Sequence, residues 1–251
     1  LFQNSSDEWA FAGQDGFPIL TSDHFTMGAR LNLDKFTFAV SGYFANKTGV
    51  IEDVKALTGF ELDAFENDLL TGTGTTKGVE STLIYSSGVH NGWISYTLGN
   101  AENSFRDQGV NTLLSSFDAL HELNLVYMIK LQNWRFASTL VLASGKPFTS
   151  SPGTYTLQLL NGETQERVSF STVNGSRLPA YQRLDFSANY EFKLGDSQVH
   201  IGGGIFNVLN HQNISNRQYF LTNSTDNGVD LAFRDLAQLG ITPTIRIGIS
   251  W

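Results

Sequence analysis

The stretch from Arg183 to Asn210 constrains the fold more than any other part of the chain, because apolar and polar residues alternate along it. A period of two places successive side chains on opposite faces of a β-strand. The polar residues Gly195-Asp196-Ser197 interrupt the alternation, so the pattern predicts two strands joined by a tight turn. In the first strand the apolar face comprises Leu184, Phe186, Ala188, Tyr190 and Phe192, and the polar face comprises Arg183, Asp185, Ser187, Asn189 and Glu191.

The same alternation recurs along the whole chain and predicts about nine strands. Besides the two strands above, we expect strands near residues 24–33, 36–46, 79–86, 93–98, 122–131, 134–142 and 241–251. Turns of a few residues join them into hairpins. Between hairpins we expect long loops at 47–76, 101–117, 144–180 and 211–240.

Two of these loops have features of their own. The loop at 47–76 has room for a short helical turn from Asp63 to Leu70, and it ends in the TGTGTTKG segment at 71–78. That segment lacks the G-K-[ST] ending of a phosphate-binding loop, so we interpret it as a flexible linker. The loop at 144–180 is expected to contain a small hairpin from Tyr155 to Ser169.

Composition limits the classes of protein to which the chain can belong. No apolar run approaches the roughly 18 residues of a membrane helix, so any membrane span must be formed by strands. The net charge of −8 argues against nucleic acid as a partner. Cysteine is absent, which excludes disulfides, thiolate metal sites and a cysteine nucleophile.

The lengths of the strands and loops favour a transmembrane β-barrel. The strands approach the roughly 9 to 11 residues of a tilted membrane-spanning strand. Short turns alternate with loops much longer than most connections in ordinary β domains. This layout is typical of outer-membrane barrels, whose long loops are extracellular and whose short turns are periplasmic.

Several segments, in their order along the chain, support a family resemblance. Four motifs occur in the order found in the C-terminal part of the barrel of TonB-dependent outer-membrane receptors, particularly those of Bacteroidota-like bacteria. They are GWISYTL, ASGKPFT, LPAYQRLDFSANYEF and NVLN. The chain resembles that family along nearly every strand. The resemblance implies a 22-stranded antiparallel barrel with a plug domain in its lumen.

The resemblance also implies a function and a set of partners. Family members in Gram-negative bacteria import a scarce ligand (a siderophore, vitamin, glycan or peptide) across the outer membrane without catalysis. The implied partners are outer-membrane lipid, the rest of the barrel and the plug, the TonB complex and a surface lipoprotein. No plug or TonB box is recognisable, so residues 1–251 are expected to form the C-terminal barrel portion, the rest lying on another chain or in a longer polypeptide.

Candidate site residues follow from the two faces of the strands. Residues on the polar faces are expected to point into the lumen, mostly as structural charge pairs; they are Arg30, Glu80, Glu122, Lys130, Arg135, Arg183, Asp185, Asn189, Glu191 and Arg246. Aromatic and apolar residues beside the short turns and at the C-terminus are expected to form the membrane girdle and the assembly signal; they are Trp134, Phe136, Tyr190, Phe192, Ile247, Ile249 and Trp251. The extracellular loops are the better candidates for ligand contact.

No catalytic, cofactor or metal site is predicted. The five histidines show no paired ligand spacing. The segment from Asp226 to Asp230 could turn around Ca²⁺, although a simple Asp-Asn-Gly turn explains it equally well. Three other functions stay open: a structural barrel subunit of a larger outer-membrane assembly, an outer-membrane enzyme and a soluble carbohydrate-binding β protein.

Overall fold

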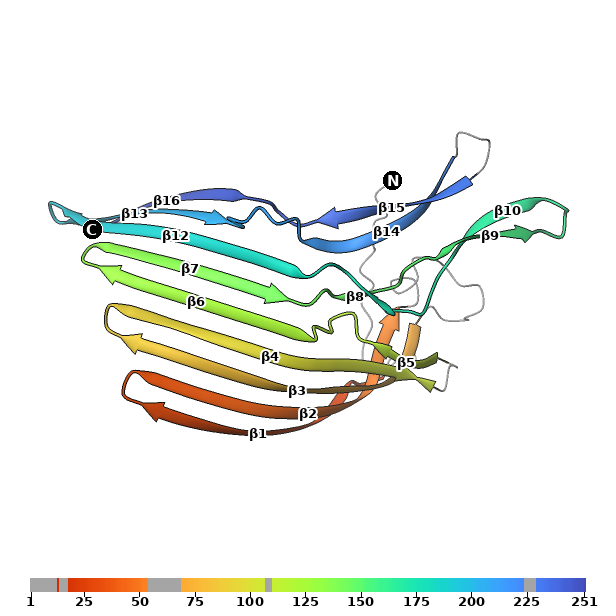
Figure 1. Ribbon diagram of the computed structural model, residues 1–251, viewed down its shortest axis with the longest axis horizontal. Coiled ribbons are helices and arrows are strands. Elements are labelled where there is room, and N and C mark those ends of the chain that lie inside the picture. The colour runs from red at the N-terminus through yellow and green to blue at the C-terminus, as the bar shows by residue number, and fades with distance from the viewer. Residues whose placement is uncertain (1–12, 14–17, 54–68, 107–109, 224–228) are drawn as a thin grey trace.

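The computed structural model describes residue 13 and residues 18–53, 69–106, 110–223 and 229–251. Its main feature is one antiparallel sheet in which nine long strands follow one another in chain order (Figure 1). These are β1 (Thr21–Leu33), β2 (Phe36–Asp53), β3 (Leu69–Ser87), β4 (His90–Phe105), β6 (His121–Leu131), β7 (Trp134–Ala143), β12 (Tyr181–Leu194), β13 (Ser197–Phe206) and β16 (Thr242–Ser250). The predicted all-β, antiparallel fold is confirmed.

The two ends of the sheet differ, as the loop lengths predict. Two-residue turns at 34–35, 88–89, 132–133 and 195–196 all lie at one end, together with the C-terminus (left in Figure 1). Gly88 and Gly195 adopt positive φ angles of 63° and 61°, which glycine tolerates without steric cost. We call this the turn end and the opposite end the loop end.

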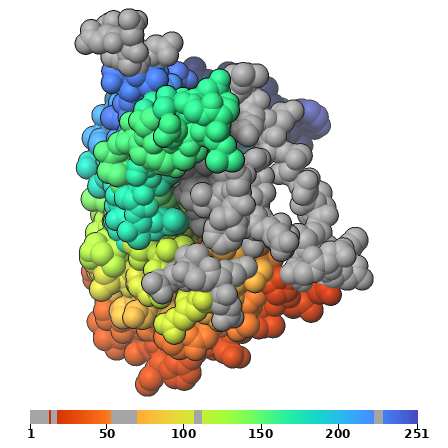
Figure 2. Space-filling model, turned by 90° about the vertical axis from the view of Figure 1, so that its right-hand side faces the viewer, coloured from red at the N-terminus to blue at the C-terminus, as the bar shows by residue number. Residues whose placement is uncertain are grey.

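The loop end contains more β-structure than the sequence predicts. A short strand, β5 (Val110–Leu114), pairs with β4, and three two-stranded ribbons lie beyond the main sheet. The ribbons pair β8 (Pro147–Phe148) with β11 (Ser176–Arg177), β9 (Gly153–Gln158) with β10 (Thr164–Ser169), and β14 (Ile214–Asn223) with β15 (Val229–Ala237). Seen from the loop end, the colours run in chain order from red at the bottom to blue at the top, and the β9–β10 ribbon, in green, lies on the side that faces the viewer (Figures 1 and 2).

Four predictions about the loops therefore need correction. The interpretation of TGTGTTKG as a flexible linker is wrong, because these residues belong to β3: all of them pair with β2, and those from Thr73 onward also pair with β4. Threonine is β-branched and favours strands, and the glycines admit closely packed neighbours. The loops predicted at 101–117 and 211–240 contain the end of β4 with β5, and the β14–β15 ribbon. Most of the helical turn expected at 63–70 lies outside the described residues, but Leu69 and Leu70 belong to β3.

The sheet has one continuous apolar face. Across the strand registers, apolar residues on neighbouring strands stand opposite one another, as in Leu31–Phe38–Leu83 and Tyr190–Ile201–Ile247. These side chains are largely exposed: the exposed fraction is 74% for Met27 and 84% for Ile245. We call this surface the apolar band.

Buried apolar packing is sparse in the part of the chain that the structure describes. Its one cluster of buried hydrophobic side chains comprises Leu70, Phe105 and Leu113, with Val50 and Val173 packed against it at the loop end. None of the described residues forms a helix long and apolar enough to cross a membrane. The sheet is thus not organised around a hydrophobic core of its own.

Candidate functional site

The polar face of the sheet lies opposite the apolar band. Strand alternation and register place the ten residues predicted to point into the lumen on this face. One row of this face crosses five strands, and its successive positions are Lys130, Arg135, Asn189, Gly202 and Arg246. Near the turn end, the row therefore presents three cations.

The carboxylate of Glu191 contacts side chains on both neighbouring strands. Glu191 Oε1 accepts a hydrogen bond from the Arg135 guanidinium and lies 3.2 Å from His200 Nδ1. The three side chains come from β7, β12 and β13, so they bridge three adjacent strands. Opposite charges on adjacent strands also stabilise their pairing.

A second group of side chains lies further toward the loop end. Arg183 Nε lies 3.0 Å from Asp185 Oδ2, and the Arg183 guanidinium stacks 4.8 Å from the centre of the Phe206 ring. Asp185 Oδ1 accepts a hydrogen bond from the backbone N–H of Asn207. This group links β12 to the segment that follows β13.

Asn207 belongs to the NVLN motif and is fully buried. Its side-chain amide donates to the carbonyl oxygens of His211 at 2.9 Å and Leu239 at 3.1 Å, and its Oδ1 accepts from the His211 N–H. Its φ of 53° is left-handed, a region in which asparagine is among the more tolerated non-glycine residues. Asn207 thus anchors both connections of the β14–β15 ribbon, a structural role that sequence alone did not reveal.

An ion pair between Asp118 and Arg177 connects other segments at the loop end. Asp118, whose side chain is 1% exposed, accepts hydrogen bonds from Arg177 Nη2 and from the Ala101 N–H. Arg177 Nη1 also donates to the Gly145 carbonyl oxygen at 3.0 Å. Four chain segments at the loop end are therefore fixed relative to one another.

The β14–β15 ribbon has an ion pair of its own. Arg217 donates from Nε and Nη2 to the two Asp235 carboxylate oxygens at 2.6 and 2.8 Å, and its guanidinium stacks 4.4 Å from the centre of the Phe233 ring. These hydrogen bonds lower the pKa of Asp235 and raise the pKa of Arg217. The ribbon beyond the sheet is therefore an ordered element.

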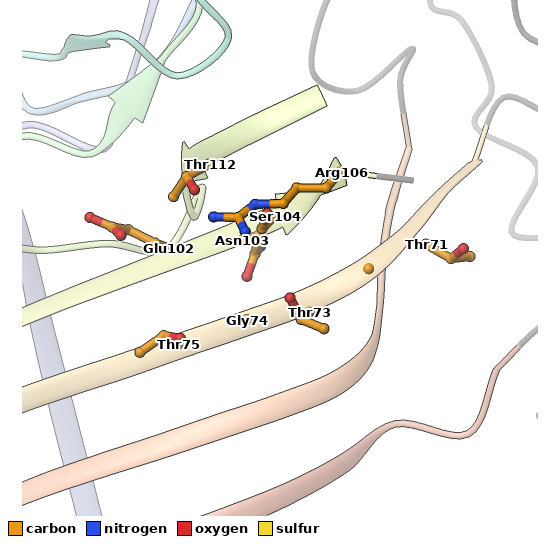
Figure 3. Close-up of a pocket in the computed structure, with 10 residues that line it drawn as sticks. Thr71, Thr73, Gly74, Thr75, Glu102, Asn103, Ser104, Arg106 and Thr112 are labelled. Carbon is orange, nitrogen blue, oxygen red and sulfur yellow. The ribbon is translucent and has the colours of Figure 1, made fainter. Parts of the chain in front are cut away.

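A polar groove of about 400 Å³ lies at the loop end (Figure 3). It lies over β3, β4 and β5. In Figure 3 the Arg106 side chain runs back toward Ser104 and Asn103. The residues that line this polar groove are Thr71, Gly72, Thr73, Gly74, Thr75, Glu102, Asn103, Ser104, Arg106 and Thr112.

The predicted girdle residues lie on the apolar band at the turn end. The Trp134 ring stands 5.5 Å from Phe136 and 4.7 Å from Tyr190, and Tyr190 stands 5.7 Å from Phe192. Ile247 and Ile249 lie opposite Ile201 and Val199, and Trp251 is 97% exposed. Two further pairs on this face, His90–Tyr127 at 2.6 Å and Tyr96–His121 at 2.8 Å, were not predicted because they depend on register.

No cluster of three or more metal-ligating side chains occurs among the described residues. The segment considered for Ca²⁺ binding, Asp226 to Asp230, lies mostly outside them. The charges that the structure brings together are pairs and bridges, whose chemistry is binding and positioning.

No protein-family model matches this chain, and no curated protein matches it in sequence. Its structure is similar to that of the ferric citrate transporter FecA in the unliganded form, with a TM-score of 0.55 and 14% identity over 91% of this chain and 31% of the transporter. The ferripyoverdine receptor of the outer membrane of Pseudomonas aeruginosa, bound to ferripyoverdine, gives a TM-score of 0.49 and 12% identity over 78% of this chain and 24% of the receptor.

The chain thus spans less than a third of the length of either protein. Both structural neighbours are named for transport or reception of an iron complex, and neither is named as an enzyme. At 14% identity the likeness to FecA establishes the fold alone. That fold is a large antiparallel β-sheet of consecutive hairpins, which this chain shares with the matched part of FecA.

Proposed function

We propose that this chain forms the C-terminal barrel wall and ligand-facing loops of an outer-membrane transporter that imports a scarce ligand with energy delivered by TonB. The observation that carries the proposal is the two-faced sheet, with an exposed apolar band on one side and charge pairs on the other. The similarity to FecA supports the proposal at the level of the fold.

The apolar band needs a nonpolar environment. Burying a Leu, Ile, Phe, Val or Met side chain is worth about 1.5–3 kcal/mol, and side chains of this kind line all nine strands. Isolated exposed hydrophobes are ordinary on soluble proteins, whereas a continuous band marks a binding or membrane surface. Contact with lipid acyl chains removes the whole apolar band from water.

The edges of the sheet support a larger barrel. In the described sheet β1 pairs only with β2, and β16 pairs only with β13, so each has one edge without a neighbouring strand. Unpaired backbone groups cost several kcal/mol each in hydrocarbon. We propose that further strands complete a barrel of the 22-stranded type and that a plug fills its lumen.

In this barrel the polar face lines the lumen. The Arg135–Glu191–His200 and Arg183–Asp185 groups stabilise the wall and leave Lys130 and Arg246 to meet the plug. Ligand contact falls to the loop end, where the ion pairs and Asn207 fix the ribbons. The cargo belongs to the classes that enter through such barrels: siderophores, vitamins, glycans or peptides.

A pair of cysteine substitutions tests the orientation of the wall, since the chain has no native cysteine. Asn124 and Leu125 are neighbours on β6 but occupy opposite faces. In outer membranes containing the full-length protein, Leu125→Cys should react with a lipid-soluble reagent and Asn124→Cys with a water-soluble maleimide. The reverse pattern, or water-soluble labelling of both positions, would overturn the proposed membrane orientation.

Uptake assays test transport itself. Cells with the full-length protein should accumulate one member of a labelled panel (a ferric siderophore, cobalamin, an oligosaccharide or a peptide) only while TonB is functional. Deleting the gene for the protein should abolish that uptake. Correct insertion without uptake of any panel member would contradict the transport role and favour a structural barrel subunit.

A further inference from the structure

The two longer ribbons at the loop end, β9–β10 and β14–β15, belong to different connections of the sheet, and they lie against each other (Figure 1). β10 approaches β14, and β9 approaches β15. Among the described residues each ribbon is nevertheless a separate two-stranded sheet, so no ladder of backbone hydrogen bonds joins one ribbon to the other. Side chains must therefore set the position of one ribbon relative to the other.

Each ribbon is fixed at its base. The connection that contains β9–β10 is closed by the β8–β11 pairing and by a hydrogen bond from the Leu178 N–H to the Lys146 carbonyl oxygen. The β14–β15 ribbon is held by Asn207 and by Asn213, whose side-chain amide exchanges two hydrogen bonds of 2.8 Å with the backbone of Gln182. These hydrogen bonds act at the foot of each ribbon, and none of them connects one ribbon to the other.

Arg217 makes a contact above these anchors. The edge of its guanidinium faces Asp235, whose carboxylate accepts hydrogen bonds from both Nε and Nη2. Its Cζ atom lies 4.4 Å from the centre of the Phe233 ring and 5.7 Å from the centre of the Phe148 ring. Both distances fall within the roughly 6 Å over which a guanidinium and an aromatic ring attract each other, and arginine can stack on a ring while its edge is hydrogen-bonded.

Phe148 is the ring that connects the two parts of the loop end. Asp235 and Phe233 belong to the same ribbon as Arg217, whereas Phe148 belongs to β8, in the connection that contains β9–β10. The Arg217 side chain is 23% exposed, so the contact is partly shielded from water. The hydrogen bonds to Asp235 orient the guanidinium within its own ribbon, and the contact with Phe148 then ties that ribbon to the neighbouring connection.

We propose that Arg217 is a positioning residue, which holds the β14–β15 ribbon against the connection of residues 144–180 by lying over Phe148. The two ribbons then present one preformed surface to an incoming ligand. A preformed surface loses less conformational entropy on binding, so this positioning favours affinity. The inference rests on the proposed function in one respect, because it takes the loop end to be the ligand-facing end.

Phe148→Leu is the decisive substitution, because it removes the ring and leaves the Arg217–Asp235 pair intact. Phe148→Tyr keeps an aromatic ring and should behave like the unsubstituted protein. Phe220→Leu is the matched control. It removes an equivalent contact, since the Arg234 guanidinium lies 5.9 Å from the centre of the Phe220 ring, but both of these residues belong to the β14–β15 ribbon.

Distance measurements between two spin labels on the full-length protein in detergent test the position of the ribbons. The chain has no cysteine, so Leu160→Cys and Thr222→Cys place one label near the tip of each ribbon. Phe148→Leu should raise the fraction of displaced ribbon roughly fivefold, the equivalent of about 1 kcal/mol. A second pair, Asn216→Cys with Thr222→Cys, lies along β14 alone and should keep a separation of roughly 20 Å, at about 3.3 Å per residue.

Equal distances between the ribbons in Phe148→Leu and the unsubstituted protein would overturn the inference, and so would an equal displacement in Phe220→Leu. A changed distance along β14 in Phe148→Leu would mean that the ring stabilises the ribbon itself, which contradicts a positioning role. These measurements need neither ligand nor TonB, so they fail independently of the transport proposal. For a labelled panel compound that is imported, Phe148→Leu should raise the half-saturating concentration and leave the maximal rate unchanged; the opposite split would contradict a role in binding. Displaced ribbons in a protein that imports no panel compound would sustain the position of Arg217 and contradict the transport function.

Discussion

Asp185 Oδ1 accepts a hydrogen bond from the backbone N–H of Asn207 at 2.9 Å, joining the polar face of β12 to the turn that follows β13. Asn207 then binds the segments on both sides of the β14–β15 ribbon. A charged residue inside the proposed lumen is thus linked, through one buried amide, to a ribbon at the loop end.

Asn207→Ala should loosen that ribbon. The substitution removes three side-chain hydrogen bonds worth about 1 kcal/mol each, so we expect a local loss of roughly 3 kcal/mol. Limited proteolysis of the full-length protein in detergent should then cleave within 211–240 much faster. Asn216→Ala is the control, because Asn216 is exposed on the same ribbon. Equal cleavage rates for the two variants would show that Asn207 is not the anchor.

The same ribbon should open at low pH. Arg217 lowers the pKa of Asp235 in the folded ribbon below its ordinary value of about 3.9, so the unfolded ribbon binds the proton more readily. The stability supplied by this pair is therefore fully present above about pH 4 and is lost as the pH falls through the folded-state pKa. Hydrogen exchange of residues 214–237, corrected for intrinsic rates, should accelerate in that range. Asp235→Asn should remove this pH dependence, and an unchanged profile in that variant would rule out Asp235 as the titrating group.

The sequence predicted the parts of the strands that carry the apolar band, but not the parts that continue beyond the band toward the loop end. Phe186 and Ile247 follow an apolar-polar alternation because one face meets a nonpolar phase and the other does not. The segment at 71–75 alternates threonine with glycine, so it has no hydrophobic signal even though it is part of a strand. Likewise Arg135 and Glu191 are 56 residues apart in the sequence, and only the strand register brings them together. Buried anchors such as Asn207 depend on loop conformation, which no periodicity encodes.

Gly78 should not tolerate a side chain. A Cβ at Gly78 would lie 2.5 Å from Tyr43 Oη and 2.6 Å from the Leu98 carbonyl oxygen, closer than real contacts allow. We expect Gly78→Ala to destabilise the sheet by about 1–3 kcal/mol through overpacking. The measurement is urea unfolding of the full-length protein in lipid vesicles. Gly42→Ala is the control, because its nearest neighbour would be 3.8 Å away; matching midpoints for both variants would contradict the close packing of Tyr43 over Gly78.

The Asp118–Arg177 pair allows a test of whether the two side chains stabilise the loop end together. Arg177→Met leaves the buried Asp118 carboxylate without its cation, so we expect a loss of about 3–5 kcal/mol. Asp118→Asn keeps an acceptor for the Ala101 N–H but leaves the Arg177 guanidinium without its carboxylate. In the double variant neither charge is unpaired, and the combined loss should be smaller than the sum of the single losses. Urea unfolding of all four proteins measures this cycle. Additive losses would mean that the two side chains stabilise the rim independently, in spite of their hydrogen bond.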